Sequence, residues 1–345
     1  MNNKISMEHG AGGFYSQELI KEIILKNISL KNSGSFGLDS LDDGASIIIN
    51  KNNKELIMTT DSHVIQPIFF DGGDIGKLSI CGVINDLSVM GAKPLALSCS
   101  LIIPEGFDTE KLEKIIISMD KISKEVNVPI ITGDTKTIEA NNLNSILINM
   151  TGIGECERPI RNSGLCIDDD IIITGDIADH GISLLIKRNG FNFKSDLKSD
   201  VAPLWNMIKL ILDYEKEINK NIITSMKDPT RGGVASALNE MAECSNVGIR
   251  IMEEELPIKK EVIAACDMLG LDPLEIANEG KAIIGVNPEY SHKVLEILKS
   301  TEYGKNSKII GKVIDNNRKK VILESKFGTK RYIDIPIGDP IPRVC

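Results

Sequence analysis

Short apolar runs rich in β-branched residues alternate along the chain with stretches whose apolar residues have helical spacing. The runs predict strands at residues 46–50, 55–61 and 144–155. Between residues 75 and 91, the apolar residues at 80, 83, 84 and 87 recur with the period of a helix. The stretch VPIITGDTK predicts a further strand, followed by a turn at Gly133 and Asp134. This alternation is typical of an α/β or α+β protein.

The composition changes at residues 155–170, where ECERPIRNSGLCIDDD is charged and broken by proline and glycine. Beyond this stretch the pattern predicts a strand at 170–176, helices at 181–189 and 202–219, and a helix that begins at Gly232-Gly233. A length of 345 residues suggests about two domains. We therefore divide the chain into a glycine-rich N-terminal segment (1–40), an N-terminal domain (41–157), a C-terminal α/β domain (158–332) and a tail (333–345).

Charge and hydropathy exclude several classes of protein. The net charge of −9 argues against a basic face for nucleic acid, so we expect no nucleic-acid partner. No apolar run has the length of a membrane span, and the first residues lack the apolar core of a signal peptide. We therefore expect no membrane association and a cytoplasmic location.

The seven cysteines form no C-x-x-C pair, and their odd number and scatter fit neither a disulfide framework nor a zinc site. Four lie in apolar surroundings, such as Cys81 and Cys99, and are expected in the core. Cys345 differs by position, because it is the last residue of PIPRVC. Pro336, Pro340 and Pro342 favour a mobile, extended tail, which would present this thiol to a partner.

Neither GGDIGKLS nor GIGECE completes a nucleotide-binding motif. The first has too few residues before its Gly-Lys pair, and the second lacks the last glycine of the dinucleotide-binding pattern. Carboxylates that hold Mg²⁺ are another way to bind a nucleotide. The candidates are Asp42 and Asp43 of LDDGAS, Asp61 of TTDSH and Asp86 of VINDLS. Each could equally be a turn former or a helix cap. Asp86 is the least ordinary, since a carboxylate within an apolar helical stretch needs a partner.

Four further stretches combine glycine with charge. The loop EHGAGG, with Gly10, Gly12 and Gly13, could approach phosphates or could simply be a mobile end. The stretch DPTRGG sets Arg231 at a helix start, an anion site, although Asp228 or Thr230 could serve only as a cap. Composition alone makes Lys136 of GDTKT and Glu279 of NEGKA surface charges.

The order of these stretches along the chain resembles one family. HGAGG, LDDGAS, the long block from TTDSH to GAKP, ITGDTKT, GDIADHGISLL, DPTRGG, NEG and the terminal PRVC resemble the HypE family of hydrogenase maturation factors. That family belongs to the superfamily of aminoimidazole ribonucleotide synthetase. The resemblance implies two α/β domains, with ATP held at an N-terminal-domain homodimer interface. The terminal PRVC has Val where Ile is most expected, a conservative difference.

The resemblance also implies a reaction. Cys345 would receive a carbamoyl group from a HypF-type carbamoyltransferase, and ATP would drive dehydration of the thiocarboxamide to a thiocyanate. The cyanide would then pass to iron on a HypC–HypD complex, as a ligand of the [NiFe]-hydrogenase centre. Phosphorylation of the amide oxygen makes it a leaving group, and a base removes the N–H protons.

The same resemblance assigns roles to residues. Asp43, Asp61 and Asp86 become ligands of magnesium or phosphate, and Lys136 and Glu279 are placed beside the modified Cys345. Lys136 would stabilise charge on the amide oxygen, and Glu279 would take or orient the N–H proton. Nucleotide-binding roles fall to Gly10, Gly12, Gly13, Gly133, Asp134, Asp228 and Arg231.

Three alternatives remain open. Selenophosphate synthetase would need a reactive Cys followed by Lys near the N-terminus, and no Cys precedes Cys81. Thiamine monophosphate kinase shares the acidic residues but has no reason to end in cysteine. A non-enzymatic scaffold would use the tail only for docking, and an ATPase assay would separate it from an enzyme.

Overall fold

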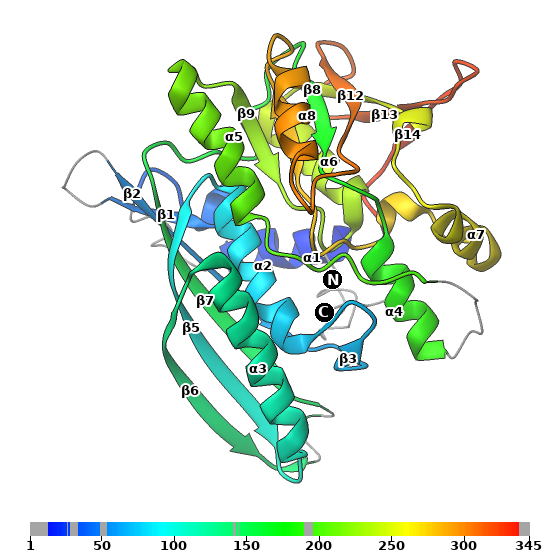
Figure 1. Ribbon diagram of the computed structural model, residues 1–345. Coiled ribbons are helices and arrows are strands. Elements are labelled where there is room, and N and C mark those ends of the chain that lie inside the picture. Colours follow the sequence, from blue (N-terminus) through cyan, green and yellow to red (C-terminus); the bar gives the residue numbers. More distant parts are fainter. Residues whose placement is uncertain are drawn as a thin grey trace.

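Two sheets of different size organise the molecule (Figure 1). The five-stranded sheet belongs to the N-terminal half and has the strand order β1-β2-β7-β5-β6. The seven-stranded sheet belongs to the C-terminal half and has the order β14-β13-β10-β12-β8-β11-β9. The computed structural model describes residues 13–25, 27, 34–48, 54–140, 143, 145–189 and 196–337.

The first half begins with two short helical segments, α1 (Phe14–Leu19) and η2 (Ile20–Leu25), and a 3-10 turn, η3 (Leu38–Ser40). Its sheet strands are β1 (Ala45–Ile48), β2 (Glu55–His63), β5 (Lys93–Pro104), β6 (Ile130–Ile138) and β7 (Leu147–Cys156). A small hairpin, β3 (Phe69–Phe70) and β4 (Gly73–Asp74), leads into α2 (Ile75–Val89), and α3 (Thr109–Val126) connects β5 to β6. Within this sheet only β5 and β6 pair in parallel.

The second half contains the strands β8 (Asp170–Ile173), β9 (Ile223–Lys227), β10 (Gly248–Met252), β11 (Ile283–Val286), β12 (Lys308–Ile314), β13 (Val321–Glu324) and β14 (Lys330–Ile333). Its helices are α4 (Asp179–Asn189), α5 (Trp205–Ile218), α6 (Gly233–Ser245), α7 (Lys260–Leu269) and α8 (Ser291–Lys299), with the 3-10 turns η5 (Glu253–Glu255) and η6 (Pro273–Glu275). The predicted α/β fold and the predicted elements of both halves are therefore confirmed, apart from one turn.

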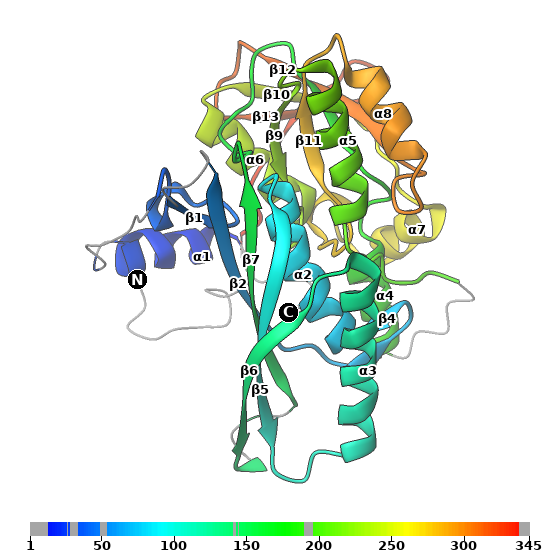
Figure 2. The same cartoon turned by 60° about the vertical axis from the view of Figure 1, so that its left-hand side comes forward.

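The helix α2 connects the two halves. The Asp74 side chain caps it by accepting hydrogen bonds from the backbone of Gly76 and Lys77, and nearly every side chain that follows is buried. One side of α2 packs against the five-stranded sheet, and another side faces α5 and β9 of the second half (Figure 2). A helix buried on all sides needs no polar face, which explains why the polar Asn85 and Asp86 stand out in its sequence.

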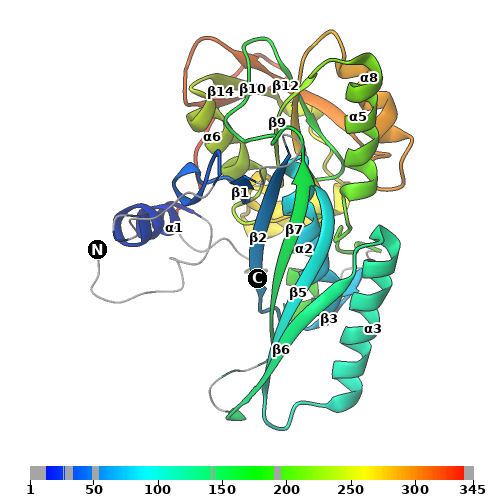
Figure 3. The same cartoon turned by 90° about the vertical axis from the view of Figure 1, so that its left-hand side faces the viewer.

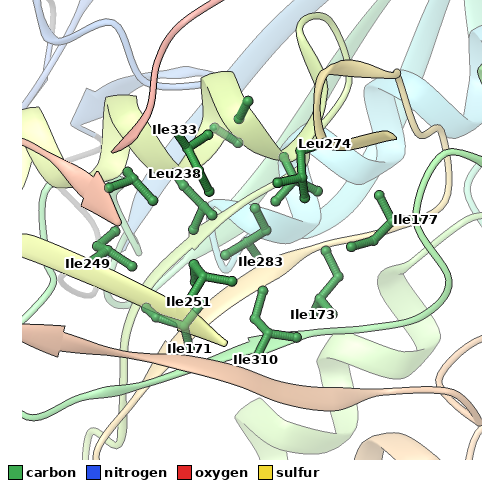
Figure 4. Packing of buried hydrophobic residues seen from close by; sticks show 14 of the residues in the cluster. Ile171, Ile173, Ile177, Leu238, Ile249, Ile251, Leu274, Ile283, Ile310 and Ile333 are labelled. Atoms are coloured by element: carbon green, nitrogen blue, oxygen red, sulfur yellow. The ribbon is translucent and has the colours of Figure 1, made fainter. Parts of the chain in front are cut away.

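The core of the second half forms between its sheet and the helices α4, α6 and α7. Isoleucines from five strands, together with Leu238 of α6 and Leu274 of η6, interdigitate there (Figure 4). A second cluster joins the halves, because Leu184, Val201 and Trp205 pack into the apolar core beneath the five-stranded sheet. The two halves are thus held together by apolar packing, which keeps groups from both halves in fixed relation.

The turn predicted at Gly133 and Asp134 is wrong. Strand β6 continues through both residues to Ile138 and pairs in register with β5. Gly133 is needed for another reason: a Cβ there would lie 2.2 Å from the carbonyl oxygen of Cys99. The glycine therefore allows close approach of two strands rather than a change of direction.

The burial of the cysteines and the length of the helices can be compared with what the sequence predicted. Cys81 and Cys99 are buried as predicted, Cys156 and Cys266 are buried as well, and Cys166 and Cys244 are exposed. Within the ranges described, no helix is both long enough and apolar enough to cross a membrane.

Candidate active site

Asp86 lies where α2 crosses β2. Its carboxylate oxygen Oδ2 accepts a hydrogen bond of 2.7 Å from Thr59 Oγ1. The partner that the sequence required for Asp86 is therefore a hydroxyl on the neighbouring strand. Burial raises the pKa of Asp86 well above its usual value, and the negative charges of Asp228, Asp61 and Asp43 add to this effect.

Asp61 lies on the same face of β2 as Thr59, two residues further along. Its Oδ2 is 3.1 Å from Nε2 of His63, and its Oδ1 accepts a hydrogen bond from the backbone of Ser62. Burial would raise the pKa of Asp61, but His63 and Arg231 outweigh burial and lower it. The Asp61 side chain is 36% exposed, so a ligand can reach it.

The absence of a side chain at Gly82 leaves room for this pair. A Cβ at Gly82 would lie 3.0 Å from His63 Nε2 and 3.1 Å from Asp61 Oδ2. Gly82 also lies one helical turn before Asp86, so α2 and β2 approach most closely where the two carboxylates lie.

The second half contributes groups from the end of β9. Lys227 forms an ion pair with Asp43 of the loop before β1, and its Nζ is 3.4 Å from Glu240 Oε2. Burial would lower the pKa of Lys227, but Asp43, Glu240 and Asp228 raise it well above the usual value, so the ammonium stays charged. For Asp228, burial together with the charge of Asp43 raises the pKa to about 7.

Asp43, Asp61, Asp86 and Asp228 thus form one electrostatically connected group, which we call the carboxylate cluster. The buried cation of Lys227 offsets only part of its charge. Such crowding of like charges is unfavourable in the ligand-free protein, and a bound cation relieves it. The cluster therefore has the donor type and charge that a hard divalent cation prefers.

The geometry sets a limit on how a metal could be held. In the described part of the chain, no three His, Cys, Asp or Glu side chains converge closely enough to hold an ion by themselves. Mg²⁺ is commonly held by one or two carboxylates, with substrate phosphates and water completing its shell. The cluster fits that mode of binding rather than a closed protein cage.

The DPTRGG loop brings Arg231 to the same place. Arg231 is exposed, and its charge contributes to lowering the pKa of Asp61. The loop enters α6 through Gly232 and Gly233, which have φ values of +74° and +61°. A Cβ at Gly233 would lie 2.5 Å from the carbonyl oxygen of Leu274, so this helix start is possible only with glycine.

Glu279 lies beside the DPTRGG loop. Asn278 joins the two stretches, because its backbone N–H and its side-chain Nδ2 each donate to the carbonyl of Pro229 at 3.1 Å. Glu279 is 3% exposed. The expectation that Glu279 is a surface charge on composition alone is therefore wrong, and its burial separates it from an ordinary solvated glutamate.

Lys136 and Asp134 are not brought to the cluster within one chain. They are exposed on β6, opposite Ile102 and Ser100 of β5. Ser100 in turn pairs with Asn149, whose side chain bonds to Ser62 on the outer face of the sheet. Lys136 and Asp134 thus lie on the face that no described helix covers, whereas Asp61 lies on the face that packs against α2 (Figure 3).

Asp42 makes different contacts from those of its neighbour Asp43. Its carboxylate accepts hydrogen bonds from Arg161 Nε at 2.8 Å and from the backbone of Asn162 at 3.1 Å. It ties the loop before β1 to the connection between the halves. The candidate Asp42 is therefore taken up by structural contacts, whereas Asp43 of the same LDDGAS stretch pairs with Lys227.

Three predicted site residues, Gly10, Gly12 and Cys345, lie outside the described residues. Gly13 is described and precedes α1, where the backbone N–H of Phe14 donates to the carbonyl of Pro336 at 3.2 Å. The end of the glycine-rich segment and the start of the proline-containing tail are therefore adjacent, although they are far apart in the sequence.

Sequence reasoning missed Thr59, His63 and Lys227. Thr59, Asp61 and His63 are spaced by two along one strand, so the strand period itself places them on one face. Lys227 directly precedes Asp228, and its charge in an apolar strand was the available signal.

Comparison with known proteins defines the class first. Residues 41–156 match the family model for the N-terminal domain of AIR synthase related proteins, and residues 167–324 match the model for the C-terminal domain. The chain thus has the two-domain fold of that class.

Similarity along the whole chain narrows the class to one family. The chain is 52% identical to a candidate hydrogenase expression/formation protein of Methanocaldococcus jannaschii, over 99% of this chain and 100% of that protein. It is 37% identical to carbamoyl dehydratase HypE of Azotobacter vinelandii, over 100% of this chain and 98% of that protein. The chain belongs to the HypE family, the carbamoyl dehydratases of hydrogenase maturation.

Solved structures agree with this assignment. A chain in the crystal structure of a HypE–HypF complex superposes with a TM-score of 0.84 and 40% identity, covering 92% of this chain and 99% of that chain. A HypE crystal structure in complex with ATP gives a TM-score of 0.80 and 35% identity, covering 99% and 100%.

Proposed function

We propose that the carboxylate cluster binds ATP with Mg²⁺ and that ATP drives dehydration of a carbamoyl group on Cys345. The observation that carries the proposal is the meeting of four carboxylates from both halves beside the cations of Lys227 and Arg231. A nucleoside triphosphate with its bound metal carries negative phosphate groups, which the two cations would contact, and a positive ion, which the carboxylates would contact. The ATP complex of a HypE that is 35% identical to this chain supports the choice of nucleotide.

The reaction conserves atoms as follows. The amide oxygen of Cys345–S–C(=O)–NH₂ attacks the γ-phosphorus of ATP, which forms a C–O–P bond and releases ADP. The C–O bond then breaks, and the oxygen leaves with inorganic phosphate. The nitrogen loses both of its protons as the carbon–nitrogen triple bond forms. The net change is thiocarboxamide plus ATP to thiocyanate, ADP and phosphate.

Asp43, Asp61 and Asp86 would serve as the ligands of the Mg²⁺ that accompanies ATP, one or two carboxylates to each ion with phosphate oxygens and water, and Asp228 would lie close to them. A bound Mg²⁺ would neutralise phosphate charge and orient the γ-phosphoryl group. Thr59 fixes the carboxylate of Asp86, and His63 fixes that of Asp61. Arg231 would contact phosphate oxygens, and the α6 start would direct backbone N–H groups to them. Gly10, Gly12 and Gly13 would cover the phosphates.

Glu279 would accept an N–H proton of the thiocarboxamide. Its burial and its place beside the DPTRGG loop support this role, since a base must lie within reach of the proton that it removes. The buried side chains of Asn85 and Asp200 form hydrogen bonds with its backbone, which would hold the carboxylate in one place. General bases of this kind contribute roughly 10²- to 10⁴-fold to rates.

The six described cysteines support Cys345 as the carrier. Burial raises the pKa of every one of them, to about 11 for Cys99 and Cys266 and about 12 for Cys156. The thiolate is the reactive form, so none of these six is activated. Ile337 is the last described residue of the tail. The residues from there to Cys345 could span at most about 29 Å if fully extended.

We further propose a homodimer through the uncovered face of the five-stranded sheet. Met58 and Ile153 are cross-strand partners there and are 43% and 38% exposed. Strand β6 is an exposed edge of the same sheet. Gly133 and Asp134 would then lie at the interface. Lys136 would lie at the same interface, and we propose that it stabilises charge on the amide oxygen of a carbamoylated tail there.

The partners follow from the reaction. A HypF-type carbamoyltransferase would load the tail, as a complex of a related HypE with HypF supports. A HypC–HypD complex would accept the cyanide onto iron. We propose the cytoplasm as the location, where ATP and these partners would be available together.

Intact mass spectrometry tests the proposal. The full-length protein is loaded by the carbamoyltransferase with carbamoyl phosphate and a limiting amount of ATP, freed of nucleotide, and then given either ATP or buffer alone. We expect a gain of one carbamoyl group followed by loss of one water only in the presence of ATP. Loss of water without nucleotide, or no loss with it, would overturn the proposed reaction.

A further inference from the structure

Asn85, the residue before Asp86, uses its whole side chain to hold the second half of the molecule. It is 2% exposed. Its Nδ2 donates to the carbonyl oxygens of Glu279 and Ala202, each at 3.1 Å. Its Oδ1 accepts a hydrogen bond of 2.8 Å from the backbone N–H of Leu204. Both N–H groups and the oxygen of the amide are therefore satisfied.

The other side of the Glu279 backbone is held as well. Its N–H donates to Asp200 Oδ1 at 3.1 Å, and Asp200 Oδ2 is 3.1 Å from Lys281 Nζ. The Asp200 side chain is 3% exposed and that of Lys281 is 9% exposed. Burial would raise the pKa of Asp200, but Lys281 and His180 outweigh it and lower the pKa, so the carboxylate stays charged. Charged acceptors make the stronger hydrogen bonds.

The turn is also closely packed. A Cβ at Gly280 would lie 2.0 Å from the carbonyl oxygen of Asp200, so the residue after Glu279 must be glycine. The Glu279 peptide groups are thus fixed by Asn85 on one side and Asp200 on the other. Rotation of the backbone at Glu279 would break at least one of these bonds.

Asn85 and Asp86 are consecutive residues of one helix and project about 100° apart. Asp86 contacts Thr59 on the sheet, whereas Asn85 contacts Glu279 in the second half. The helix α2 therefore contacts the sheet through Asp86 and the second half through Asn85. This fixes the position of Glu279 relative to Asp86, a carboxylate of the proposed nucleotide site.

We propose that Asn85 is a positioning residue, which holds the Glu279 carboxylate in register with the carboxylate cluster so that phosphorylation of the amide oxygen is followed by proton removal from the nitrogen of the same thiocarboxamide. The proposal rests on the proposed function of Glu279. Asn85 itself touches neither nucleotide nor thiocarboxamide. Its bonds to Ala202 and Leu204 would hold the halves together in any case, so the bond to Glu279 is the one that serves the reaction.

The test compares Asn85→Ala with a matched control, Asn239→Ala. Asn239 is also a buried helical asparagine whose Nδ2 donates to two backbone carbonyls, those of Ala235 and Ile333, each at 2.9 Å. Asn85→Ala loses three side-chain hydrogen bonds and Asn239→Ala loses two, of which two in each variant go from Nδ2 to backbone carbonyls. The readouts are thermal unfolding, ATP affinity, and the single-turnover rate from thiocarboxamide to thiocyanate at saturating ATP.

We expect Asn85→Ala to bind ATP as wild type does and to slow dehydration roughly 10- to 100-fold, the effect of misplacing a catalytic group by about 1 Å. Asn239→Ala should keep the wild-type rate despite a similar loss of thermal stability. The double variant Asn85→Ala/Glu279→Gln should be no slower than Glu279→Gln alone, because both changes remove the same step.

Two outcomes would overturn the inference. One is an Asn85→Ala rate equal to that of Asn239→Ala while Glu279→Gln stalls, and the other is a double variant much slower than either single one. A normal rate for Glu279→Gln would instead overturn the proposed function itself. If Asn85→Ala does not fold, Asn85→Ser, which keeps a polar side chain too short to reach both carbonyls, takes its place in the same comparison.

Discussion

Lys227 and Asp43 form an ion pair that joins the two halves of the molecule at the carboxylate cluster. The lysine comes from the end of a strand in the second half, and the aspartate comes from the loop before β1. The buried ammonium partly neutralises a site that otherwise carries four carboxylates. The remaining charge is what makes the site suited to a metal–nucleotide complex, and the predictions below follow from it.

Asp86→Asn should remove most ATP hydrolysis, by roughly 100-fold, because a neutral amide is a poorer ligand for Mg²⁺ and for the charges of the transition state. Thermal stability should not fall, since burial and three neighbouring carboxylates disfavour the charge on Asp86. Asp42→Asn is the matched control, because Asp42 pairs with Arg161 instead of the cluster. Near-wild-type hydrolysis by a folded Asp86→Asn protein would contradict the assignment.

Glu279→Gln should bind ATP and accept the carbamoyl group, yet stall as the thiocarboxamide. The glutamine keeps the size of the side chain and leaves the backbone bonds to Asn85 and Asp200 intact. Intact mass measured over time separates the two adducts by one water. Formation of thiocyanate at the normal rate would show that Glu279 takes no proton.

Gly82→Ala should lower nucleotide turnover while leaving the fold stable. Alanine is favoured over glycine within a helix by about 1 kcal/mol. The added Cβ would lie 3.0 Å from His63 Nε2 and 3.1 Å from Asp61 Oδ2, so this pair must move. ATP hydrolysis and thermal unfolding are measured together, with Ser88→Ala on the same helix as the control. Unchanged hydrolysis would mean that the position of Asp61 does not matter.

His180 should make the protein less stable in mild acid. The ring is 0% exposed, its Nδ1 is hydrogen-bonded to Ser199 Oγ at 2.7 Å, and it packs edge-on against Phe70. Burial lowers its pKa from 6.5 to about 4, with Arg188 and His63 acting in the same direction and Asp200 opposing them. Between these two values the unfolded chain binds a proton that the folded chain does not.

The free energy of unfolding should therefore fall as the pH is lowered from 6.5 toward 4, by about 3 kcal/mol from this group. His180→Asn keeps a partner for Ser199 and removes the titration. Denaturant unfolding at pH 7 and at pH 4.5 should show a smaller difference for the variant than for wild type. Parallel changes in the two proteins would exclude His180 as the cause.

The sequence predicted much of the fold because its patterns are local. Helical spacing located α2, and β-branched runs located β1, β2 and β7. The turn at Gly133 failed because its glycine serves the approach of β5, a contact between distant residues. The site was partly predictable for the same reason: Asp43, Asp61 and Asp86 lie in distinctive local motifs, whereas Lys227 becomes important only through its pairing with Asp43.

The positions of Lys136 and Glu279 could not be predicted from the sequence, for a related reason. Register alone decides that Lys136 lies on the outer face of the sheet, and a shift of one residue would reverse it. Glu279 is buried because Asn85, 194 residues away, holds its backbone. Neither fact has a local signature.

The measurement that tests the account most directly is the location of the carbamoyl group. The protein and Cys345→Ala are each treated with the carbamoyltransferase, carbamoyl phosphate and ATP, digested, and mapped by mass spectrometry. Cys345→Ala should keep its fold and its ATP binding and gain no adduct, because desolvation raises the pKa of each of the six described thiols, helped by neighbouring carboxylates at the exposed Cys166 and Cys244. Wild type should carry the carbamoyl gain and the later loss of water on Cys345 alone. An adduct on Cys81, Cys99 or any other cysteine, or cyanide formation by Cys345→Ala, would contradict the account.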